Sequence, residues 1–221
     1  MSKNGDGAEI KETAEHYIGD GVRAVPSGRL SFEEFLQWAD EDTWAEWVEG
    51  EVRVMTPASA RHQKICAFLV AILTEFTSHK GLGEVLFAPF LVRLPEPLKR
   101  GREPDLIFVA KERLSLLKPT YLDGAPDLVV EITSPESIAR DRGEKFVEYE
   151  AAGVREYWLI DPDRKQVEFY RLGENGRYCL FTADAGGIYR CHVIPGLWLR
   201  VDWLWQEPLP SVLKVLRELG I

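Results

Sequence analysis

The longest periodic stretch of the chain has hydrophobic residues every three or four positions. Its apolar positions are Ile65, Phe68, Leu69, Ile72, Leu73 and Phe76. This spacing places them on one face of an α-helix. Pro57 and Ser59 precede the stretch as residues typical of a helix start, and Gly81 follows it as a helix-stop residue. The pattern therefore predicts one long amphipathic helix between Ser59 and Gly81.

Shorter helices are predicted where a capping pair precedes apolar residues. Ser31 with Glu34, and Asp141 with Glu144, have the three-residue separation of such pairs. Gly153 is typical of the position just beyond a helix C-terminus. The expected short helices span residues 31–39, 141–152 and 211–219.

Apolar runs of strand length account for most of the remaining chain. The segment from Trp44 to Met55 predicts a hairpin that turns at Glu49-Gly50. Its candidates for inward-facing side chains are Val48, Val52 and Val54. Further strands are expected at residues 84–94, 105–109, 127–133, 156–160, 166–172, 178–182 and 188–193. Helices and antiparallel strands around a mixed sheet predict an α/β fold.

The amino-terminal part of the chain has a different character. Residues 1–28 are polar, rich in glycine and without sustained periodicity, so they are expected to form a flexible leader. Residues 29–221 are expected to form a single domain. The leader lacks the apolar core of a signal peptide, and no stretch approaches the roughly 18 uninterrupted apolar residues of a membrane span. These features predict a cytoplasmic protein that does not cross a membrane.

Composition supports one folded domain and narrows its chemistry. The chain has 221 residues, 45% of them hydrophobic and 29% charged, which is enough to bury a core. Lys and Arg number 27 against 36 Asp and Glu, and the net charge of −9 argues against non-specific nucleic-acid binding while leaving room for a local basic groove. The three cysteines lack CxxC spacing, so a zinc site is not expected. They are expected to be small, buried side chains with free thiols.

One carboxylate interrupts a run that otherwise predicts a buried strand. Glu131 follows the apolar residues 128–130 and precedes Ile132. An ionised carboxylate without partners costs on the order of several kcal/mol in a protein interior. Either a buried ion pair or a shared divalent cation would compensate it. The arginines available for an ion pair are Arg102, Arg140 and Arg142.

The cation hypothesis needs a second carboxylate, and Asp105 is the candidate. Pro104-Asp105 leads into an apolar run, as Pro126-Asp127 does, although each pair alone is typical of an ordinary strand entrance. On neighbouring strands Asp105 and Glu131 would face each other, and hard oxygen ligands suit Mg²⁺ or Mn²⁺. Asp127 lies on the same strand as Glu131, about 13 Å away, which is too far to share one ion. It is interpreted as a strand-start residue.

The series Pro104-Asp105, Glu131-Ile132-Thr133 and Lys145 resembles the PD-(D/E)XK nuclease superfamily. Longer segments resemble one bacterial branch, the Uma-type restriction endonuclease family. They are VEGEVRVMTPASARHQ (48–63), REPDLIFV (102–109), APDLVVEITSPES (125–137), RDRGEKFVEYEAAGVREYWLIDP (140–162) and IPGLWLRVD (194–202). The resemblance covers roughly residues 30–205 and implies a restriction-endonuclease-like fold, a mixed sheet flanked by helices with extra antiparallel strands.

The resemblance also implies roles for individual residues. Asp105 corresponds to the acid of the PD element and Glu131 to the acid of the (D/E)XK element. Both would hold the metal, with the Ile132 carbonyl as a third ligand. Thr133 stands where the superfamily has its lysine, and in this branch that role resembles one carried by a lysine on the following helix, here Lys145.

Helical geometry is compatible with this role for Lys145. Positions 138, 142, 145 and 149 would form one stripe, and Phe146 and Tyr149 would face the sheet. Without the resemblance, a solvated lysine paired with Asp141 or Glu148 is the simpler interpretation.

Weaker candidates lie upstream. The resemblance implies an extra acid from the hairpin, among Glu46, Glu49 and Glu51, and Glu46 is preferred because Glu49 lies at the turn. His62, in the first turn of the long helix, is equally compatible with a phosphate or metal-bound water ligand and with a surface position. A local basic surface is expected from Arg61, Lys64, Lys99, Arg100 and Arg102. The tryptophans Trp44, Trp47, Trp198, Trp203 and Trp205 are expected in a core or dimer interface rather than stacked on bases.

The residues and the resemblance together predict an endonuclease that uses Mg²⁺ or Mn²⁺ to hydrolyse DNA phosphodiester bonds. Asp105 and Glu131 would hold the metal, and Lys145 would assist the attacking water. A non-catalytic module of the same fold, binding nucleic acid or a protein, is the alternative. The carboxy-terminal aromatic residues are compatible with a homodimer.

Overall fold

The computed structural model describes residues 17–18, 22–23, 25–26, 28–39 and 43–221. Most of the predicted leader, residues 1–28, lies outside these residues, and its flexibility stays a prediction. Within that segment β1 (Tyr17–Ile18) and β2 (Val22–Arg23) pair as antiparallel strands. The division into a leader and one domain of residues 29–221 also stays a prediction.

A six-stranded sheet forms the centre of the molecule. In spatial order its strands are β13 (Tyr178–Phe181), β12 (Gln166–Leu172), β11 (Glu156–Asp161), β10 (Leu128–Ile132), β8 (Leu106–Ala110) and β5 (Gly83–Phe87). β10 and β11 run parallel, and the other neighbouring strands are antiparallel. The sheet is therefore mixed, as the apolar pattern predicts. β10 and β11 are buried along their whole length because both faces of the sheet are covered.

A five-stranded sheet packs beside it. Its strands are, in order, β4 (Glu51–Val54), β3 (Ala45–Val48), β7 (Arg100–Arg102), β6 (Leu91–Arg93) and β9 (Tyr121–Asp123). Helix α1 (Phe32–Trp38) begins at the predicted Ser31 capping box. Its residues Phe32 and Phe35 form a small core with Trp47 of β3. The predicted hairpin is thus the edge of a second sheet.

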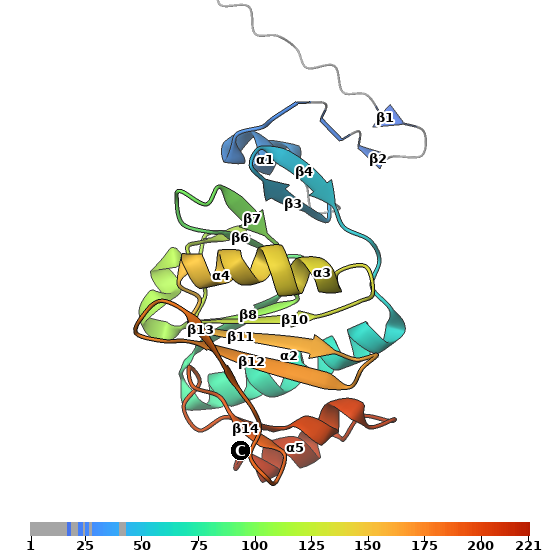
Figure 1. The fold of residues 1–221 in the computed structure, drawn as a ribbon, viewed down its shortest axis with the longest axis vertical. Coiled ribbons are helices and arrows are strands. Elements are labelled where there is room, and N and C mark those ends of the chain that lie inside the picture. Colours follow the sequence, from blue (N-terminus) through green and yellow to red (C-terminus); the bar gives the residue numbers. More distant parts are fainter. Residues whose placement is uncertain (1–16, 19–21, 24, 27, 40–42) are drawn as a thin grey trace, which may run out of the picture.

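Helices cover both faces of the central sheet (Figure 1). α2 (Ala60–Lys80) has Ser59 as its N-cap and Gly81, at φ 63°, as its C-cap, and its predicted stripe is buried against one face. The other face meets one continuous helical segment, made of α3 (Ile138–Arg140), a π-helical turn (Asp141–Lys145) and α4 (Phe146–Ala152). α5 (Val212–Glu218) packs beyond α2.

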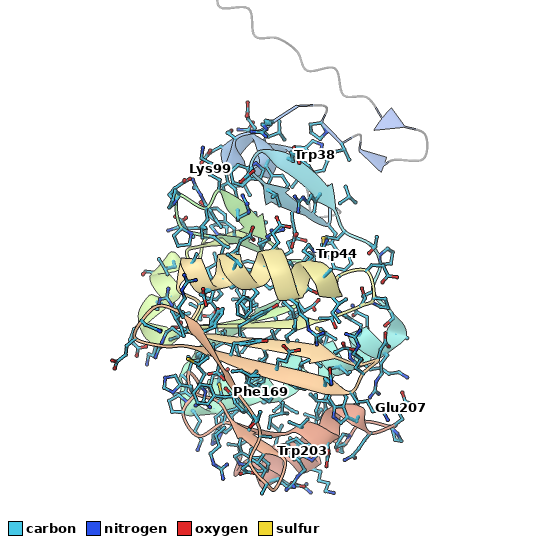
Figure 2. The ribbon with its side chains drawn as sticks, in the orientation of Figure 1. Trp38, Trp44, Lys99, Phe169, Trp203 and Glu207 are labelled. Carbon is cyan, nitrogen blue, oxygen red and sulfur yellow. The ribbon has the colours of Figure 1, made fainter. Side chains whose placement is uncertain are left out.

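The remaining elements are short. β14 (Ile188–Arg190) pairs with β15 (Trp198–Arg200), and 3₁₀ turns span Lys111–Leu116 and Val201–Trp205. In Figure 2, Trp203 lies with these last elements, and Phe169 lies in the sheet layer next to them. Within the described part of the chain, no helix is both long enough and apolar enough to cross a bilayer.

Strand alternation decides which way Glu131 points. Leu128, Val130 and Ile132 join the core on the α2 side of the sheet, whereas Val129 joins the core on the α4 side. Because successive side chains of a strand face opposite sides, Glu131 shares the α4 face with Val129. The register pairs Val130 with Leu106 of β8, so the next step places Asp105 beside Glu131.

Several local expectations were wrong. Val54 is 59% exposed, because β4 is the edge strand of its sheet. The run 84–94 divides into β5 and β6, which belong to different sheets. Cys179 is exposed rather than buried. Asp141 is not an N-cap, because the helical segment begins before it, at Ile138. The stripe also differs, since Arg142 turns outward to pair with Glu168.

The carboxy-terminal region is anchored by a buried acid that the sequence analysis did not single out. Glu156, fully buried on β11, accepts hydrogen bonds from Trp158 Nε1 (2.7 Å) and the Tyr189 hydroxyl (2.7 Å). It also accepts from the backbone N–H groups of His192 (2.7 Å) and Val193 (3.0 Å). Beyond this anchor, Trp203 is buried in the chain's own core, and a homodimer stays a prediction.

Replacing Glu156 with alanine should lower the free energy of unfolding by about 3 kcal/mol or more, because four donors lose their acceptor in a buried site. Urea denaturation measures this. The matched control is Glu174→Ala, an exposed acid that should change stability by less than about 0.5 kcal/mol. Equal effects of the two changes would contradict the anchoring role.

The three cysteines should differ in reactivity. Cys179 is exposed and should react first with a thiol reagent such as DTNB. Burial and the charge of Glu156 raise the pKa of Cys191 well above its usual value, so Cys191 should react only when the protein unfolds. Cys179→Ser should remove the fast phase. A fast phase that survives this change would show that another thiol is accessible.

Candidate active site

A cavity of about 550 Å³ opens at the carboxyl ends of the parallel strands β10 and β11. Its wall comes from the start of α2, the residues before β8, the segment after β10 and the π-helical turn. The titratable and charged side chains that line it include those of His62, Glu103, Asp105, Glu131, Arg140, Asp141 and Lys145. Trp44 also lines it, and Figure 2 shows Trp44 near α3.

Asp105 directly precedes β8 and lines the cavity. Its Oδ2 accepts a hydrogen bond from the backbone N–H of Ile132 (2.7 Å) and lies 3.1 Å from His62 Nε2. Burial alone would lower the pKa of His62, but the hydrogen bond and charge of Asp105 outweigh it and raise that pKa. These contacts tie α2, β8 and β10 together around one carboxylate.

Glu131 meets two donors from the helical segment. Lys145 Nζ and the Tyr149 hydroxyl both donate to its Oε1, at 2.9 and 2.8 Å. Only 4% of Glu131 is exposed. Burial and the charges of Asp141 and Asp105 raise the pKa of Glu131, although Lys145 opposes the rise. The buried carboxylate is therefore compensated by a lysine, rather than by one of the three arginines considered from the sequence.

Lys145 lies among carboxylates from three elements. Besides Glu131, its Nζ is 3.2 Å from Glu46 Oε1 and 3.6 Å from Asp141 Oδ1. Burial would lower the pKa of Lys145, but these negative charges outweigh burial and raise it, so the ammonium stays charged. Only 1% of Lys145 is exposed, so the simpler interpretation of a solvated lysine is wrong.

Glu46 contacts Lys145 and is itself paired with Arg102, and neither Glu46 nor Arg102 lines the cavity. Arg102 is fully buried, and its guanidinium contacts Glu46 (2.7 Å), Glu148 (2.7 Å) and Glu144 (3.0 Å). Burial would raise the pKa of Glu46, but Lys145 and Arg102 outweigh it and lower that pKa to about 2. Arg102 thus belongs to no surface, contrary to the basic patch predicted from the sequence.

Two acids of the cavity have an oxygen without a hydrogen bond, although that of Asp141 is ion-paired with Lys145 at 3.6 Å. Glu103 Oε2 and Asp141 Oδ1 are buried and accept no hydrogen bond within the described residues. Burial and the charge of Glu46 raise the pKa of Glu103 to about 8, with Lys145 opposing. Such groups are costly in a protein interior unless something in the cavity meets them.

The structure brings together the residues proposed from the sequence. Asp105, Glu131, Lys145 and His62 line one cavity, and Glu46 lies behind it on Lys145. Ile132 contributes its N–H to Asp105, and the role of its carbonyl stays a prediction. Asp127 is separate from this cavity, because its carboxylate binds the Ala110 N–H (2.8 Å) and contacts the side chains of Arg113 and Arg155. It is the strand-start residue expected.

Other residues of the site were not proposed for it. Tyr149 was expected to face the sheet, and its hydroxyl contact with Glu131 was not foreseen. Glu103 stands immediately before Pro104-Asp105, and its place beside an acid motif was the available signal. Arg140 and Asp141 open the segment 140–162 that carried the resemblance. No sequence signal identified the buried position of Arg102.

Two carboxylates of the cavity have oxygens of the kind that a hard divalent cation takes as ligands. Only Oδ2 of Asp105 and Oε1 of Glu131 make the side-chain hydrogen bonds described, which leaves one oxygen of each carboxylate for an ion. The carboxyl groups of Glu103 and Asp141 lie nearby, and each has a buried oxygen that accepts no hydrogen bond within the described residues. Within residues 43–221, however, no group of three or more His, Cys, Asp or Glu side chains has metal-site geometry.

A second, mostly apolar cavity of about 510 Å³ adjoins the first. Asp105 and Trp44 line both cavities. Its other walls include Cys66 and Val70 of α2 and the half-exposed ring of Phe87. The carboxylate site therefore has an apolar neighbour on the α2 side.

Comparison with known proteins identifies relatives of this chain. Residues 32–202 match the profile of the Uma2 family, described as "Putative restriction endonuclease". An uncharacterized protein of Synechocystis sp. is 26% identical over 188 residues, covering 83% of this chain and 95% of that protein. The crystal structure of a protein described as "a putative nuclease" from Anabaena variabilis superposes with a TM-score of 0.67 at 18% identity, covering 80% of this chain and 97% of that one. The last comparison confirms the predicted fold.

Arg102→Met should lower the free energy of unfolding by about 3–5 kcal/mol, because Glu46 would keep only Lys145 and Glu148 only Arg100 as a cation in a buried site. Adding Glu148→Gln should recover part of the loss, with a coupling energy of about 0.5–3 kcal/mol. Urea denaturation of the single and double variants measures both. Arg164→Met, an exposed control, should cost less than about 0.5 kcal/mol. An Arg102 variant as stable as this control would contradict the buried network.

Proposed function

Because the chain belongs to the Uma2 family of restriction-endonuclease-like proteins, we propose that it is a metal-dependent endonuclease that hydrolyses DNA phosphodiester bonds. The observation that carries the proposal is the convergence of Asp105, Glu131 and Lys145 on one open cavity. These residues are distant in sequence and come from strand β10, from the position just before β8 and from a helical turn. Their meeting at the carboxyl ends of parallel strands is typical of a binding site in an α/β fold.

Asp105 and Glu131 would hold a Mg²⁺ or Mn²⁺ ion through their free oxygens. When bound, such an ion polarises a non-bridging phosphate oxygen and lowers the pKa of a coordinated water. His62 and the Ile132 N–H fix the orientation of Asp105, and Tyr149 fixes that of Glu131. Held side chains of this kind reduce the reorganisation that reaction would otherwise require.

Lys145 supplies the positive charge of the site. Its ammonium would orient the attacking water or stabilise the negative charge that develops on the phosphoryl oxygens. In-line attack forms a bond from the water oxygen to phosphorus and breaks the bond from phosphorus to the 3′ oxygen. Glu46, held by Arg102, is proposed to position Lys145 rather than to contact substrate, because it does not line the cavity.

One observation favours the alternative, a non-catalytic binding module of the same fold. The Lys145 ammonium already has three carboxylate neighbours, and Glu131 is one of them. A purely structural ion cluster would have the same contacts. Metal binding separates the two functions, since the endonuclease requires a divalent cation at Asp105 and Glu131 and the module does not.

Glu131→Gln and Asp105→Asn should each abolish Mg²⁺-dependent cleavage of plasmid or linear DNA and weaken Mn²⁺ binding measured by calorimetry. Each change removes the negative charge of a ligand while nearly preserving its shape. Lys145→Met should reduce the rate by about 10²–10³-fold. Removing the metal with EDTA should stop cleavage by the unmodified protein.

The matched control is Glu168→Gln, an acid on β12 that pairs with Arg142 outside the cavity. It should retain both Mn²⁺ binding and cleavage. Undiminished cleavage by Glu131→Gln would exclude the assigned metal ligand. Indifference of the unmodified protein to Mn²⁺, together with no cleavage, would establish the binding module instead.

A further inference from the structure

Three cationic side chains line the cavity, and they differ in what neutralises them. Arg61 pairs with Glu207 (3.2 Å) and donates to the Leu204 carbonyl (2.6 Å). Lys145 has its three carboxylate neighbours. Arg140 makes no ion pair and no hydrogen bond within the part of the chain that the structure describes, although acids lie on the same wall. Its charge is therefore available to a ligand.

The position of Arg140 makes this charge costly without a ligand. It is the last residue of α3, directly before the turn that carries Asp141 and Lys145. Its side chain is half-buried, and its Nε is buried without an acceptor. A desolvated donor of this kind costs free energy until an acceptor reaches it. The acceptor is expected to come from whatever occupies the cavity.

We infer that Arg140 binds a phosphate group of the substrate strand, through non-bridging oxygens of the backbone that enters the cavity. A guanidinium presents paired N–H donors that match two phosphate oxygens, and it remains charged at all physiological pH values. The inference rests on the proposed function, because it takes the phosphate from the same nucleic-acid backbone. Arg140 would contact the substrate directly, whereas Glu46 and Arg102 act through Lys145.

If Arg140 had only a structural role, its removal would have different effects. Its charge also stabilises the ionised form of Glu46, so it could serve only as a counter-charge to the acids around it. In that case its removal would alter stability and cation binding. It would not alter the number of phosphate contacts made by a bound strand, which the salt dependence of binding reports.

The experiment compares Arg140→Gln, Arg140→Lys and Arg142→Gln. Arg142 is the matched control, because it lies two residues away on the same helical segment and pairs with Glu168 outside the cavity. All variants are made in the otherwise unmodified protein with Ca²⁺ in place of Mg²⁺, so that the cation site stays intact, and intact strands are verified on a gel. Binding of a short fluorescein-labelled DNA strand is followed by anisotropy across a salt series.

Arg140→Gln should weaken binding about tenfold, as expected for one charge-assisted contact, and should reduce the slope of log Kd against log salt by about one unit. Arg140→Lys should keep most of the slope while losing affinity, because it retains the charge without the paired donors. Arg142→Gln should leave both unchanged. Inorganic phosphate should compete with the DNA strand for binding to the protein that retains Arg140. It should compete less for binding to the Arg140→Gln variant.

An unchanged slope in Arg140→Gln, or an equal loss in Arg142→Gln, would overturn the inference. Its failure is distinct from failure of the proposed function. A protein that cleaves DNA but binds it independently of Arg140 refutes only the phosphate contact. A protein that never cleaves, yet binds a strand through Arg140, refutes only the hydrolysis.

Discussion

The arrangement of the site depends on the ion pairs of the Lys145 ammonium. Its three carboxylate neighbours come from β10, from β3 of the second sheet and from the π-helical turn. Because each acid belongs to a different element, the ion contacts fix the positions of both sheets and the helical segment relative to one another. Buried ion clusters seldom stabilise a protein more than well-packed apolar residues would. The presence of this cluster at the wall of an open cavity therefore favours a chemical role over a purely stabilising one.

The π-helical turn explains how a lysine from a helix reaches a strand carboxylate. Thr133, two residues after Glu131, is buried where a strand lysine would otherwise lie. The turn from Asp141 to Lys145 buries both of its end residues on the face that Tyr149 continues. π turns widen the helix locally and often occur at functional sites. The same widening directs Arg142 outward to Glu168, which a regular helical stripe did not predict.

The parts of the site that could be predicted are those with a local signature. Glu131 can be recognised from the sequence because it is a carboxylate within the apolar run of β10. Asp105, at the entrance of β8, becomes its neighbour once the two strands pair. Arg102 carries no such signature, because β7 has only three residues, RGR, and its pattern resembles an exposed turn. Its burial depends on Glu46 and Glu148, which lie more than forty residues away on either side. Long-range charge compensation of this kind depends on tertiary packing, and a single sequence holds no periodic trace of it.

Charge decides how a phosphodiester could enter this cavity. Seven carboxylates and four cations line the cavity or lie directly behind it: Glu46, Glu103, Asp105, Glu131, Glu136, Asp141 and Asp163, with Arg61, Arg102, Arg140 and Lys145. Arg102 is shared with two further acids outside the wall, so the surplus is negative; burial, and then neighbouring carboxylates, raise the pKa values of Glu103 and Glu131. A phosphate would be repelled by this surplus unless a divalent cation offset it. Cation and backbone binding are therefore expected to support each other, which reconciles an acidic protein, at net charge −9, with a nucleic-acid substrate.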